Sequence, residues 1–296
     1  MLIQKIKTEL RKLDIKPKKG LGQNFLVNEN AYKKIVDALE LTPNDTVVEV
    51  GPGLGTLTKL LSASGAAVLA VEKDRLLADY LKIKFANNNS VTIVEEDILN
   101  FNPKRYTLNA KRFKVVGNIP YYLTSHLLRI VLESWPRPEL LVLMLQKEVA
   151  QRICAKPPRM SLLAVSIQYY AQPKLISYVS RGSFYPSPEV DSAIIKLVVS
   201  DQFSTVNDKT INSEKTSNPR SLNGHKLQTV NFFRIARAGF AKKRKQLVNN
   251  LSTELKITKN EVEVKLTAVG IDPRRRAETL TIDEWQKVTN TFYSQD

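Results

Sequence analysis

Short apolar runs alternate with segments that carry apolar residues at helical spacing between residues 28 and 199. The runs are rich in Val, Ile and Leu, which is typical of buried parallel strands. Asn28 and Asp74 precede two of the helical segments and are suited to cap them. Residues 174–179 and 193–199 are expected to pair antiparallel at the sheet edge. Five earlier strands are expected, at residues 46–50, 67–71, 91–94, 112–116 and 140–145. The pattern predicts an α/β fold.

The two ends of the chain follow different patterns. Residues 1–20 hold seven Lys and Arg against two acids, with apolar residues at helical spacing, which predicts a short amphipathic helix in a basic leader. Residues 201–227 are rich in Ser, Thr, Asn and Lys, which is typical of a flexible linker or insertion. Residues 228–296 are expected to form a small helical domain. The first domain is therefore expected at 1–200, with the leader and a glycine-broken loop at 1–27.

A glycine-rich segment joins the first expected strand to the helix after it. Its sequence is Glu49-Val50-Gly51-Pro52-Gly53-Leu54-Gly55. Glycine permits positive φ angles and close approach of a ligand, and open α/β sheets bind nucleotide-like ligands at this turn. The spacing Gly-x-Gly-x-Gly lacks the third glycine of the dinucleotide type, so it favours a nucleoside over a pyrophosphate. Taken alone, the segment also fits an ordinary strand-to-helix turn, although less well.

Polar groups also follow the next three expected strands. Glu72 lies 21 residues after Gly51, which suits a carboxylate that accepts hydrogen bonds from ribose hydroxyls. Asp97 follows the third strand, and Asn118-Ile119-Pro120-Tyr121 follows the fourth. An acid at such a position can simply cap a helix. Four polar strand ends in succession on one rim of a sheet favour a ligand site instead.

Composition narrows the class of partner and of chemistry. The 296 residues carry a formal net charge of +16, which favours nucleic acid over an anionic membrane surface as partner. Cys154 is the only cysteine, which excludes an internal disulfide and a cysteine-based zinc cluster, and with two histidines no metal site is expected. No apolar run is long enough for a membrane span, and no secretory or transit peptide is convincing. A cytoplasmic protein is therefore expected.

The order of glycine turn, ribose acid, second acid and Asn-Ile-Pro-Tyr resembles the methyltransferases that use S-adenosyl-L-methionine to modify an exocyclic amine of a base. Two further segments narrow this resemblance: Gly22-Gln23-Asn24-Phe25-Leu26 and Phe184-Tyr185-Pro186-Ser187-Pro188-Glu189-Val190-Asp191-Ser192-Ala193. With them, nearly the whole chain is similar to the KsgA (RsmA) family, the adenine N6-dimethyltransferases of small-subunit (16S) rRNA. The resemblance implies a Rossmann-like seven-stranded class I methyltransferase sheet with a small all-α C-terminal domain.

The resemblance also implies roles for individual residues. The side-chain oxygen of Asn118 and the carbonyl of Ile119 would accept the two hydrogens of the target amine. Pro120 would fix the direction of that carbonyl, while Tyr121 and Phe184 would stack on the target base. Tyr122 is expected to pack in the core. Cofactor contacts are implied for Asn24, Leu26, Gly51, Gly53, Glu72 (ribose hydroxyls), Asp97 (adenine amine) and Asn118.

Basic residues cluster in the leader and at two places in the helical domain. Such clusters are usually solvated surfaces. Here they coincide with the net charge and with the family segments Gly239-Phe240-Ala241-x-x-Arg244-Lys245 and Gly270-Ile271-Asp272-Pro273-x-x-Arg276-Ala277-Glu278. RNA contacts are therefore expected from Lys18, Lys19, Lys243, Arg244, Lys245, Arg274, Arg275 and Arg276.

The expected function is dimethylation of the N6 amino groups of two adjacent adenosines near the 3′ end of small-subunit rRNA, with a role in ribosome biogenesis. The expected partner is this RNA in an immature small subunit. The protein is expected to act as a monomer and not to bind a membrane. One alternative is an Erm-type methyltransferase of large-subunit rRNA, which the segment at 270–278 disfavours. Another is a non-catalytic ribosome-assembly or nucleic-acid-binding factor on the same fold, which intact Glu72, Asp97, Asn118 and Tyr121 disfavour.

Overall fold

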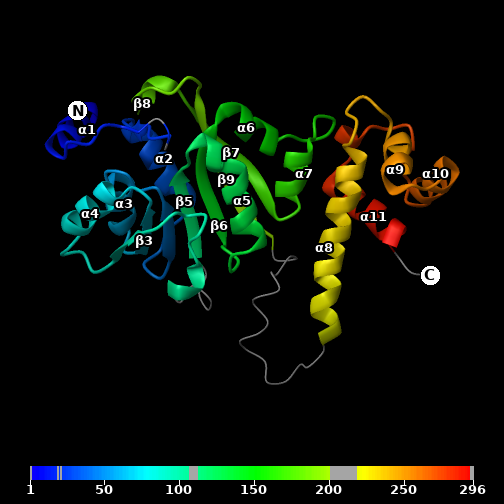
Figure 1. Cartoon of the computed structure of the whole chain (residues 1–296), viewed down its shortest axis with the longest axis horizontal. Coiled ribbons are helices and arrows are strands. Elements are labelled where there is room, and N and C mark those ends of the chain that lie inside the picture. Colours follow the sequence, from blue (N-terminus) through cyan, green and yellow to red (C-terminus); the bar gives the residue numbers. More distant parts are fainter. Residues whose placement is uncertain (1, 19, 21, 107–112, 201–218, 294–296) are drawn as a thin grey trace. The chain divides into compact units, whose positions relative to one another are not determined.

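The computed structural model describes residues 2–18, 20, 22–106, 113–200 and 219–293, with the backbone alone at 219–226. The chain divides into two compact units (Figure 1). The first comprises Met1–Ala150 and Ala171–Asp208, and the second comprises Gln151–Tyr170 and Lys209–Asp296. Residues 151–170 thus belong to the second unit, whereas the sequence analysis assigned them to the first domain.

A seven-stranded sheet with the order β4-β3-β2-β5-β6-β9-β7 forms the centre of the first unit. Neighbours from β4 to β6 are parallel, whereas β9 pairs antiparallel with both β6 and β7. The seven-stranded sheet and its antiparallel edge pair are therefore confirmed. Residue 112, where the fourth strand was expected to begin, lies outside the described residues. The strands are β2 (Thr46–Val50), β3 (Ala67–Glu72), β4 (Val91–Glu95), β5 (Phe113–Asn118), β6 (Leu140–Gln146), β7 (Ala171–Val179) and β9 (Ser192–Val199).

Helices precede, connect and follow these strands, and two of them begin at the predicted caps. Asn28 accepts a hydrogen bond from the backbone N–H of Ala31, and Asp74 accepts one from that of Leu76, so both predicted helix caps are confirmed. The helices are α1 (Leu2–Lys12), α2 (Glu29–Leu39), α3 (Thr56–Ser62), α4 (Arg75–Lys84), α5 (Thr124–Glu133) and α6 (Lys147–Ile153).

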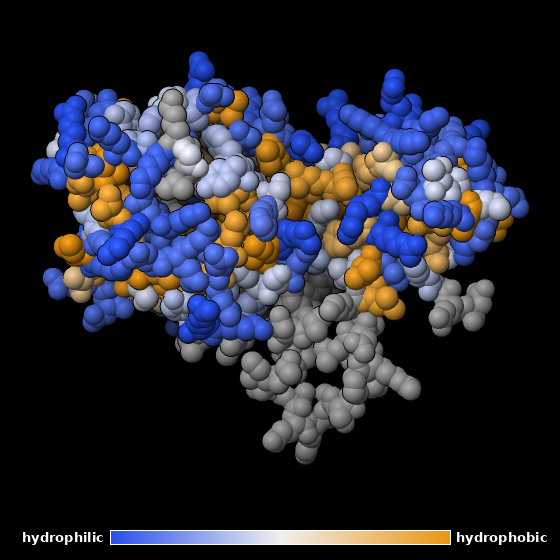
Figure 2. Space-filling model, viewed as in Figure 1, coloured by the Kyte–Doolittle hydropathy of each residue, from blue (hydrophilic) through white to orange (hydrophobic). Residues whose placement is uncertain are grey.

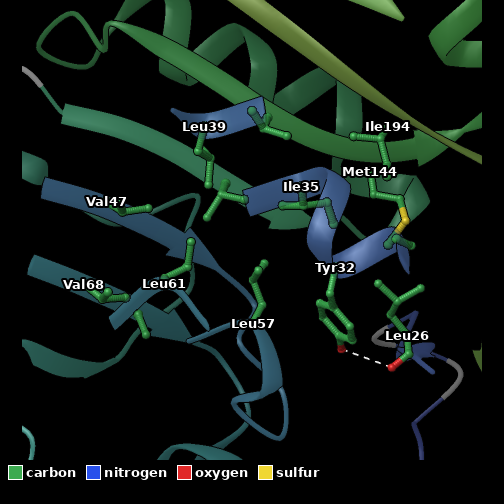
Figure 3. Close-up of a cluster of buried hydrophobic side chains, with 14 of the residues drawn as sticks. Leu26, Tyr32, Ile35, Leu39, Val47, Leu57, Leu61, Val68, Met144 and Ile194 are labelled. Carbon is green, nitrogen blue, oxygen red and sulfur yellow. Dashed lines mark hydrogen bonds between the residues drawn. The ribbon is translucent and has the colours of Figure 1, made fainter. Parts of the chain in front are cut away.

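One apolar cluster joins α2 and α3 to the sheet (Figure 3). Ile35 and Leu39 of α2 pack with Leu61 of α3, and each is at most 2% exposed. Burying a side chain of this size contributes roughly 1.5–3 kcal/mol. The hydroxyl of Tyr32 donates a hydrogen bond of 3.1 Å to the carbonyl of Leu26, so α2 also anchors the loop that precedes it.

The leader forms the predicted amphipathic helix, α1. Ile6 and Leu10 are buried on one face of it and form a second apolar cluster with Leu54 and Leu77. Leu54 belongs to the glycine-rich turn, and Leu77 lies in α4. The helix therefore packs against the elements that begin just beyond β2 and β3.

A two-stranded sheet holds the loop at 22–26 against the segment that follows β7. β1 (Phe25–Leu26) pairs antiparallel with β8 (Phe184–Tyr185), with Leu26 opposite Phe184. The sequence analysis did not predict this pairing, because two-residue strands are too short to show a period in the sequence.

The second unit is helical, as the sequence predicts. Its helix α8 begins at Pro219, so residues 219–227 are helical although the predicted linker extended to 227. Residues 201–218 of that linker lie outside the described residues. Tyr169 packs on Phe232 with a ring-centre distance of 4.1 Å, which explains why residues 151–170 belong to this unit. No helix among the described residues could cross a membrane. The helices are α7 (Leu162–Gln168), α8 (Pro219–Gly239), α9 (Leu247–Leu255), α10 (Lys259–Ala268) and α11 (Ile282–Tyr293).

Candidate active site

A pocket opens at the rim where β2, β3, β4 and β5 end. The loop at 22–26 and Ile6 of the leader helix complete its wall. All seven residues predicted to contact the cofactor line it: Asn24, Leu26, Gly51, Gly53, Glu72, Asp97 and Asn118. The structure thus brings together residues that are up to 94 positions apart in the sequence, from Asn24 to Asn118.

The glycine turn is shaped by its backbone angles and by close packing. Gly51 has φ +65°, and a Cβ atom added there would meet no atom within 4 Å, so open space borders the backbone. Gly55 has φ +74°, and a Cβ atom there would lie 2.6 Å from a methyl group of Leu81. The first glycine therefore leaves room for a ligand, whereas the third permits close packing of the turn on α4.

Glu72 is fixed by the turn that it faces. Its Oε2 accepts a hydrogen bond of 3.0 Å from the backbone N–H of Gly53, and its Oε1 accepts one of 2.9 Å from that of Asp74. The residue is 6% exposed, and this burial raises the pKa of its carboxyl. Each oxygen keeps a further lone pair, so the carboxylate can accept from two hydroxyls of a ligand.

Glu49 is a pocket residue that the sequence analysis did not select. It is 1% exposed, and its Oε2 has no hydrogen-bond partner among the described residues. Burial raises the pKa of this carboxyl to about 8, and the nearby Glu72 carboxylate adds to the effect. The signal in the sequence was an acid among the valines of strand β2, because a buried acid with an unpartnered oxygen is costly and points to a ligand.

Asp97 is held in place from two sides. Its Oδ2 lies 2.7 Å from Nζ of Lys73, and its Oδ1 accepts a hydrogen bond of 3.0 Å from the backbone N–H of Leu99. Burial opposes ionisation of this carboxyl, but these two contacts keep its pKa below the ordinary value. Lys73 itself lines the pocket and was also missed by the sequence analysis.

The Asn-Ile-Pro-Tyr segment follows β5 directly. The side-chain nitrogen of Asn118 donates a hydrogen bond of 2.9 Å to the carbonyl of Asn24. Ile119 is 1% exposed, and its backbone N–H bonds the carbonyl of Met144 on β6. Pro120 lines the pocket, whereas the hydroxyl of Tyr121 lies 3.0 Å from Oγ of Ser192 outside it.

Two aromatic residues lie where the sequence analysis did not expect them. Phe184 is 4% exposed and packs in the cluster that includes Leu26 and Ile194, and it is not part of the pocket wall. Tyr122 was expected in the core, which is wrong, because it is 58% exposed and lines the pocket. The residue follows the turn after β5, which directs its ring over the loop at Gly22 rather than into the sheet.

The basic residues differ in what surrounds them. Lys18 lies 2.7 Å from the carboxylate of Asp74, the cap of α4, so its ammonium ties the leader to that helix. Arg275 makes two hydrogen bonds to Glu284, at 2.6 and 3.1 Å. Arg274 pairs with Asp272. Lys19 lies outside the described residues.

The remaining basic residues in the helical unit lie in two adjoining loops. Lys243, Arg244 and Lys245 are exposed in the loop before α9, and Arg276 is exposed in the loop at 272–276. Backbone N–H groups at the start of α9 bond carbonyls at residues 273 and 275, which joins the two loops. Figure 2 shows a largely hydrophilic surface around the connection from α8 to α9.

Solved structures with the same architecture are methyltransferases. The 23S rRNA methyltransferase ErmE superimposes with a TM-score of 0.69, is 24% identical, and is matched over 90% of this chain and 99% of its own. A dimethyladenosine transferase from Plasmodium falciparum gives a TM-score of 0.70 at 23% identity, over 89% and 95% of the two chains. At these identities the likeness establishes the fold, which is the class I methyltransferase fold.

Sequence relatives define the family. The model of the ribosomal RNA adenine dimethylase family matches residues 15–212. The ribosomal RNA small subunit methyltransferase A of Dehalococcoides mccartyi is 42% identical over 97% of this chain and 92% of its own. The protein of the same name from Clostridium botulinum is 37% identical over 96% and 97%. The chain belongs to the ribosomal RNA adenine dimethylase family.

Proposed function

We propose that this protein transfers methyl groups from S-adenosylmethionine to the N6 amino groups of two adjacent adenosines near the 3′ end of small-subunit rRNA. The supporting observation is that the glycine turn, Glu72, Asp97 and Asn118 meet in one pocket, in a chain of the ribosomal RNA adenine dimethylase family. The relatives named small subunit methyltransferase A match nearly the whole chain, which favours the small subunit over the large one. The reaction would be a step in small-subunit biogenesis.

The pocket fits the cofactor, whose sulfonium supplies an activated methyl group when bound. Glu72 would accept hydrogen bonds from the ribose hydroxyls, and Asp97 would accept one from the adenine amine. Glu49 would face the ammonium group of the amino-acid part, because a buried carboxyl with an unpartnered oxygen gains most from an opposite charge. Gly51 leaves room for close approach, while Asn24 and Leu26 close the pocket from the loop.

The acceptor amine is a weak nucleophile, because its lone pair is delocalised into the adenine ring. Oδ1 of Asn118 and the carbonyl of Ile119 would each accept one N6 hydrogen, which favours a pyramidal nitrogen and stabilises the positive charge that develops. Pro120 restricts the backbone so that this carbonyl keeps its direction. The rest of the rate enhancement would come from holding the amine in line with the methyl group. A strong general base is unnecessary, since the proton leaves a nitrogen that is already cationic.

The target base would lie against aromatic side chains. Tyr121 is oriented by its contact with Ser192, which fixes the ring beside the Asn-Ile-Pro backbone. Phe184 is proposed as the second stacking residue, although its ring is buried, so the base would reach it only where β8 meets the rim. A Phe184→Ala variant that loses thermal stability but keeps its turnover would reassign Phe184 to the core.

RNA phosphates would be bound chiefly by Lys243, Arg244, Lys245 and Arg276, whose side chains are exposed. Arg274 would contribute less, since it already pairs with Asp272. We assign Lys18 and Arg275 to the fold, because both are engaged in ion pairs. The proposed partner is an immature small subunit, which the protein would bind as a monomer in the cytoplasm.

The deciding experiment is incubation of immature small subunits with labelled S-adenosylmethionine, followed by mapping of the modified bases. We expect dimethyladenosine at two adjacent positions near the 3′ end, and no label with Asn118→Ala. Label on large-subunit rRNA instead would indicate the Erm-type activity. Tight binding to subunits without any methyl transfer would indicate a non-catalytic assembly factor.

A further inference from the structure

A lysine and an exposed tyrosine form a pair on the first unit, outside the cofactor pocket. Lys147 begins α6 directly after β6, and Tyr178 lies at the end of β7. The Nζ atom of Lys147 is 5.3 Å from the centre of the Tyr178 ring, and Tyr178 is 50% exposed. Neither residue lines the pocket. The proposed cofactor and acceptor sites use neither of them.

The strand register places this pair on the same rim of the sheet as Asn118. Asn118 lies opposite Met144 on β6, and Tyr178 lies opposite Ala193, the second residue of β9. Three strand spacings separate β5 from β7, which amounts to about 14 Å. Stacked nucleotides advance about 3.4 Å each along a strand and unstacked ones advance further. The register also turns the Tyr178 side chain to the face opposite that of Asn118, because Asn118 shares a row with Ile194 and Tyr178 shares one with Ala193. An RNA strand that passes over the rim can therefore place on Tyr178 a nucleotide a few positions away from a base held at Asn118, but not the adjacent one.

The ammonium of Lys147 is held loosely. Its Nζ atom lies 3.9 Å from Oδ2 of Asp191, and the two side chains are 42% and 43% exposed. Such a long, exposed ion pair contributes little, so a phosphate can draw the ammonium away. That movement would take the ammonium off the half-exposed Tyr178 ring.

The backbone around Asp191 connects the pair to the acceptor site. The backbone N–H of Lys147 bonds the carbonyl of Asp191 at 3.0 Å, and the next residue, Ser192, contacts the hydroxyl of Tyr121. Oδ1 of Asp191 also accepts from the backbone N–H of Arg181 at 3.0 Å. The backbone at Asp191 and Ser192 therefore connects Lys147 to Tyr121, the residue proposed to stack on the target base.

We propose that Tyr178 and Lys147 form a subsite for a nucleotide that lies a few positions from the target adenosine in the RNA. The base of this nucleotide stacks on the ring of Tyr178, and the ammonium of Lys147 binds its phosphate. Stacking on an aromatic ring suits any base, because every base has a π-face. The inference rests on the proposed function.

The test compares Tyr178→Ala, Tyr178→Phe, Tyr178→Leu and Lys147→Met with the wild-type protein on immature small subunits. Tyr178→Ala and Tyr178→Leu should raise KM and the subunit Kd about tenfold, and Tyr178→Phe should retain wild-type values, because the ring does the stacking. Lys147→Met should weaken binding and reduce its salt dependence. The Kd for S-adenosylmethionine should not change in any of them. Tyr178→Leu keeps an apolar side chain, which guards against a folding defect.

Phe292→Ala is the matched control, since Lys265 lies 5.6 Å from the Phe292 ring in the second unit in the same kind of pair. Wild-type KM and Kd for Tyr178→Leu and Lys147→Met, or an equal weakening in Phe292→Ala, would overturn the subsite. Binding to subunits is measured separately from turnover, so the subsite can be tested even if the wild-type protein transfers no methyl group. A lack of methyl transfer by the wild-type protein would overturn the proposed function but not the subsite.

Discussion

The side-chain nitrogen of Asn118 lies 2.9 Å from the backbone carbonyl of Asn24, to which it donates a hydrogen bond. The bond joins the end of β5 to the loop that closes the pocket proposed for the cofactor. Because the nitrogen of the amide faces the loop, the oxygen is the atom left to accept from a substrate amine. This hydrogen bond thus couples closure of the pocket to the orientation of the proposed acceptor group.

Asn118→Ala should abolish methyl transfer while the cofactor Kd stays within about tenfold of wild type, because the interaction acts mainly in the transition state. Asn118→Asp retains an acceptor oxygen but sets a carboxylate oxygen against the Asn24 carbonyl, so its turnover should lie between those of Ala and wild type. Single-turnover transfer of labelled methyl groups measures both. Normal turnover by Asn118→Ala would remove this residue from the mechanism.

Glu72→Ala should weaken binding of S-adenosylmethionine by about 1–3 kcal/mol, the cost of removing a charged hydrogen-bond partner. Part of this effect would come from the turn, because Glu72 also accepts the N–H of Gly53. Titration calorimetry gives the affinity directly. Glu95→Gln is the matched control, since Glu95 lies opposite Glu72 in the sheet but pairs with Lys82 at the surface. Equal affinities for the Glu72 and Glu95 variants would contradict the assigned role.

Glu49 predicts a dependence of stability on pH in the absence of cofactor. An acid whose pKa is raised in the folded state, here to about 8, holds its proton more tightly than in the unfolded chain. Its contribution to stability is therefore greatest below the unfolded value of about 4.3 and is lost as the pH rises toward 8, by an amount on the order of a few kcal/mol. Glu49→Gln cannot ionise, so its melting temperature should exceed that of wild type increasingly between pH 5 and pH 8. Parallel melting curves across this range would show that Glu49 ionises normally.

Local pattern was sufficient to predict the elements that carry the pocket. β2, the glycine turn and the cap at Asp74 are each encoded within a few consecutive residues. The parallel order of the strands then brings Glu72 and Asp97 to one rim, as predicted. These features depend on short-range periodicity and on turn chemistry, which a sequence displays directly.

Features set by contacts between distant residues could not be predicted. The pairing of Leu26 with Phe184 joins segments 158 positions apart and gives no periodic signal. Lys18 and Arg275 resemble other surface cations in sequence, yet each has a carboxylate beside it in the fold, Asp74 for the former and Glu284 for the latter. Whether a cation is available to RNA is therefore decided by its neighbours in space.

The basic loops give the last prediction. Replacing Lys243, Arg244 and Lys245 together with Ala should weaken binding to immature small subunits and lower its salt dependence, by about 0.7–0.9 in the log–log slope for each RNA phosphate that is no longer neutralised. The three side chains are exposed, so thermal stability and the Kd for S-adenosylmethionine should stay near wild type. Arg275→Ala is the contrasting variant from the adjoining loop: it breaks the two bonds to Glu284 and should lower the melting temperature while leaving the salt slope unchanged. A wild-type salt slope in the triple variant would mean that these lysines and Arg244 only solubilise the surface. RNA recognition would then have to be sought in the leader and in the segment at 200–227.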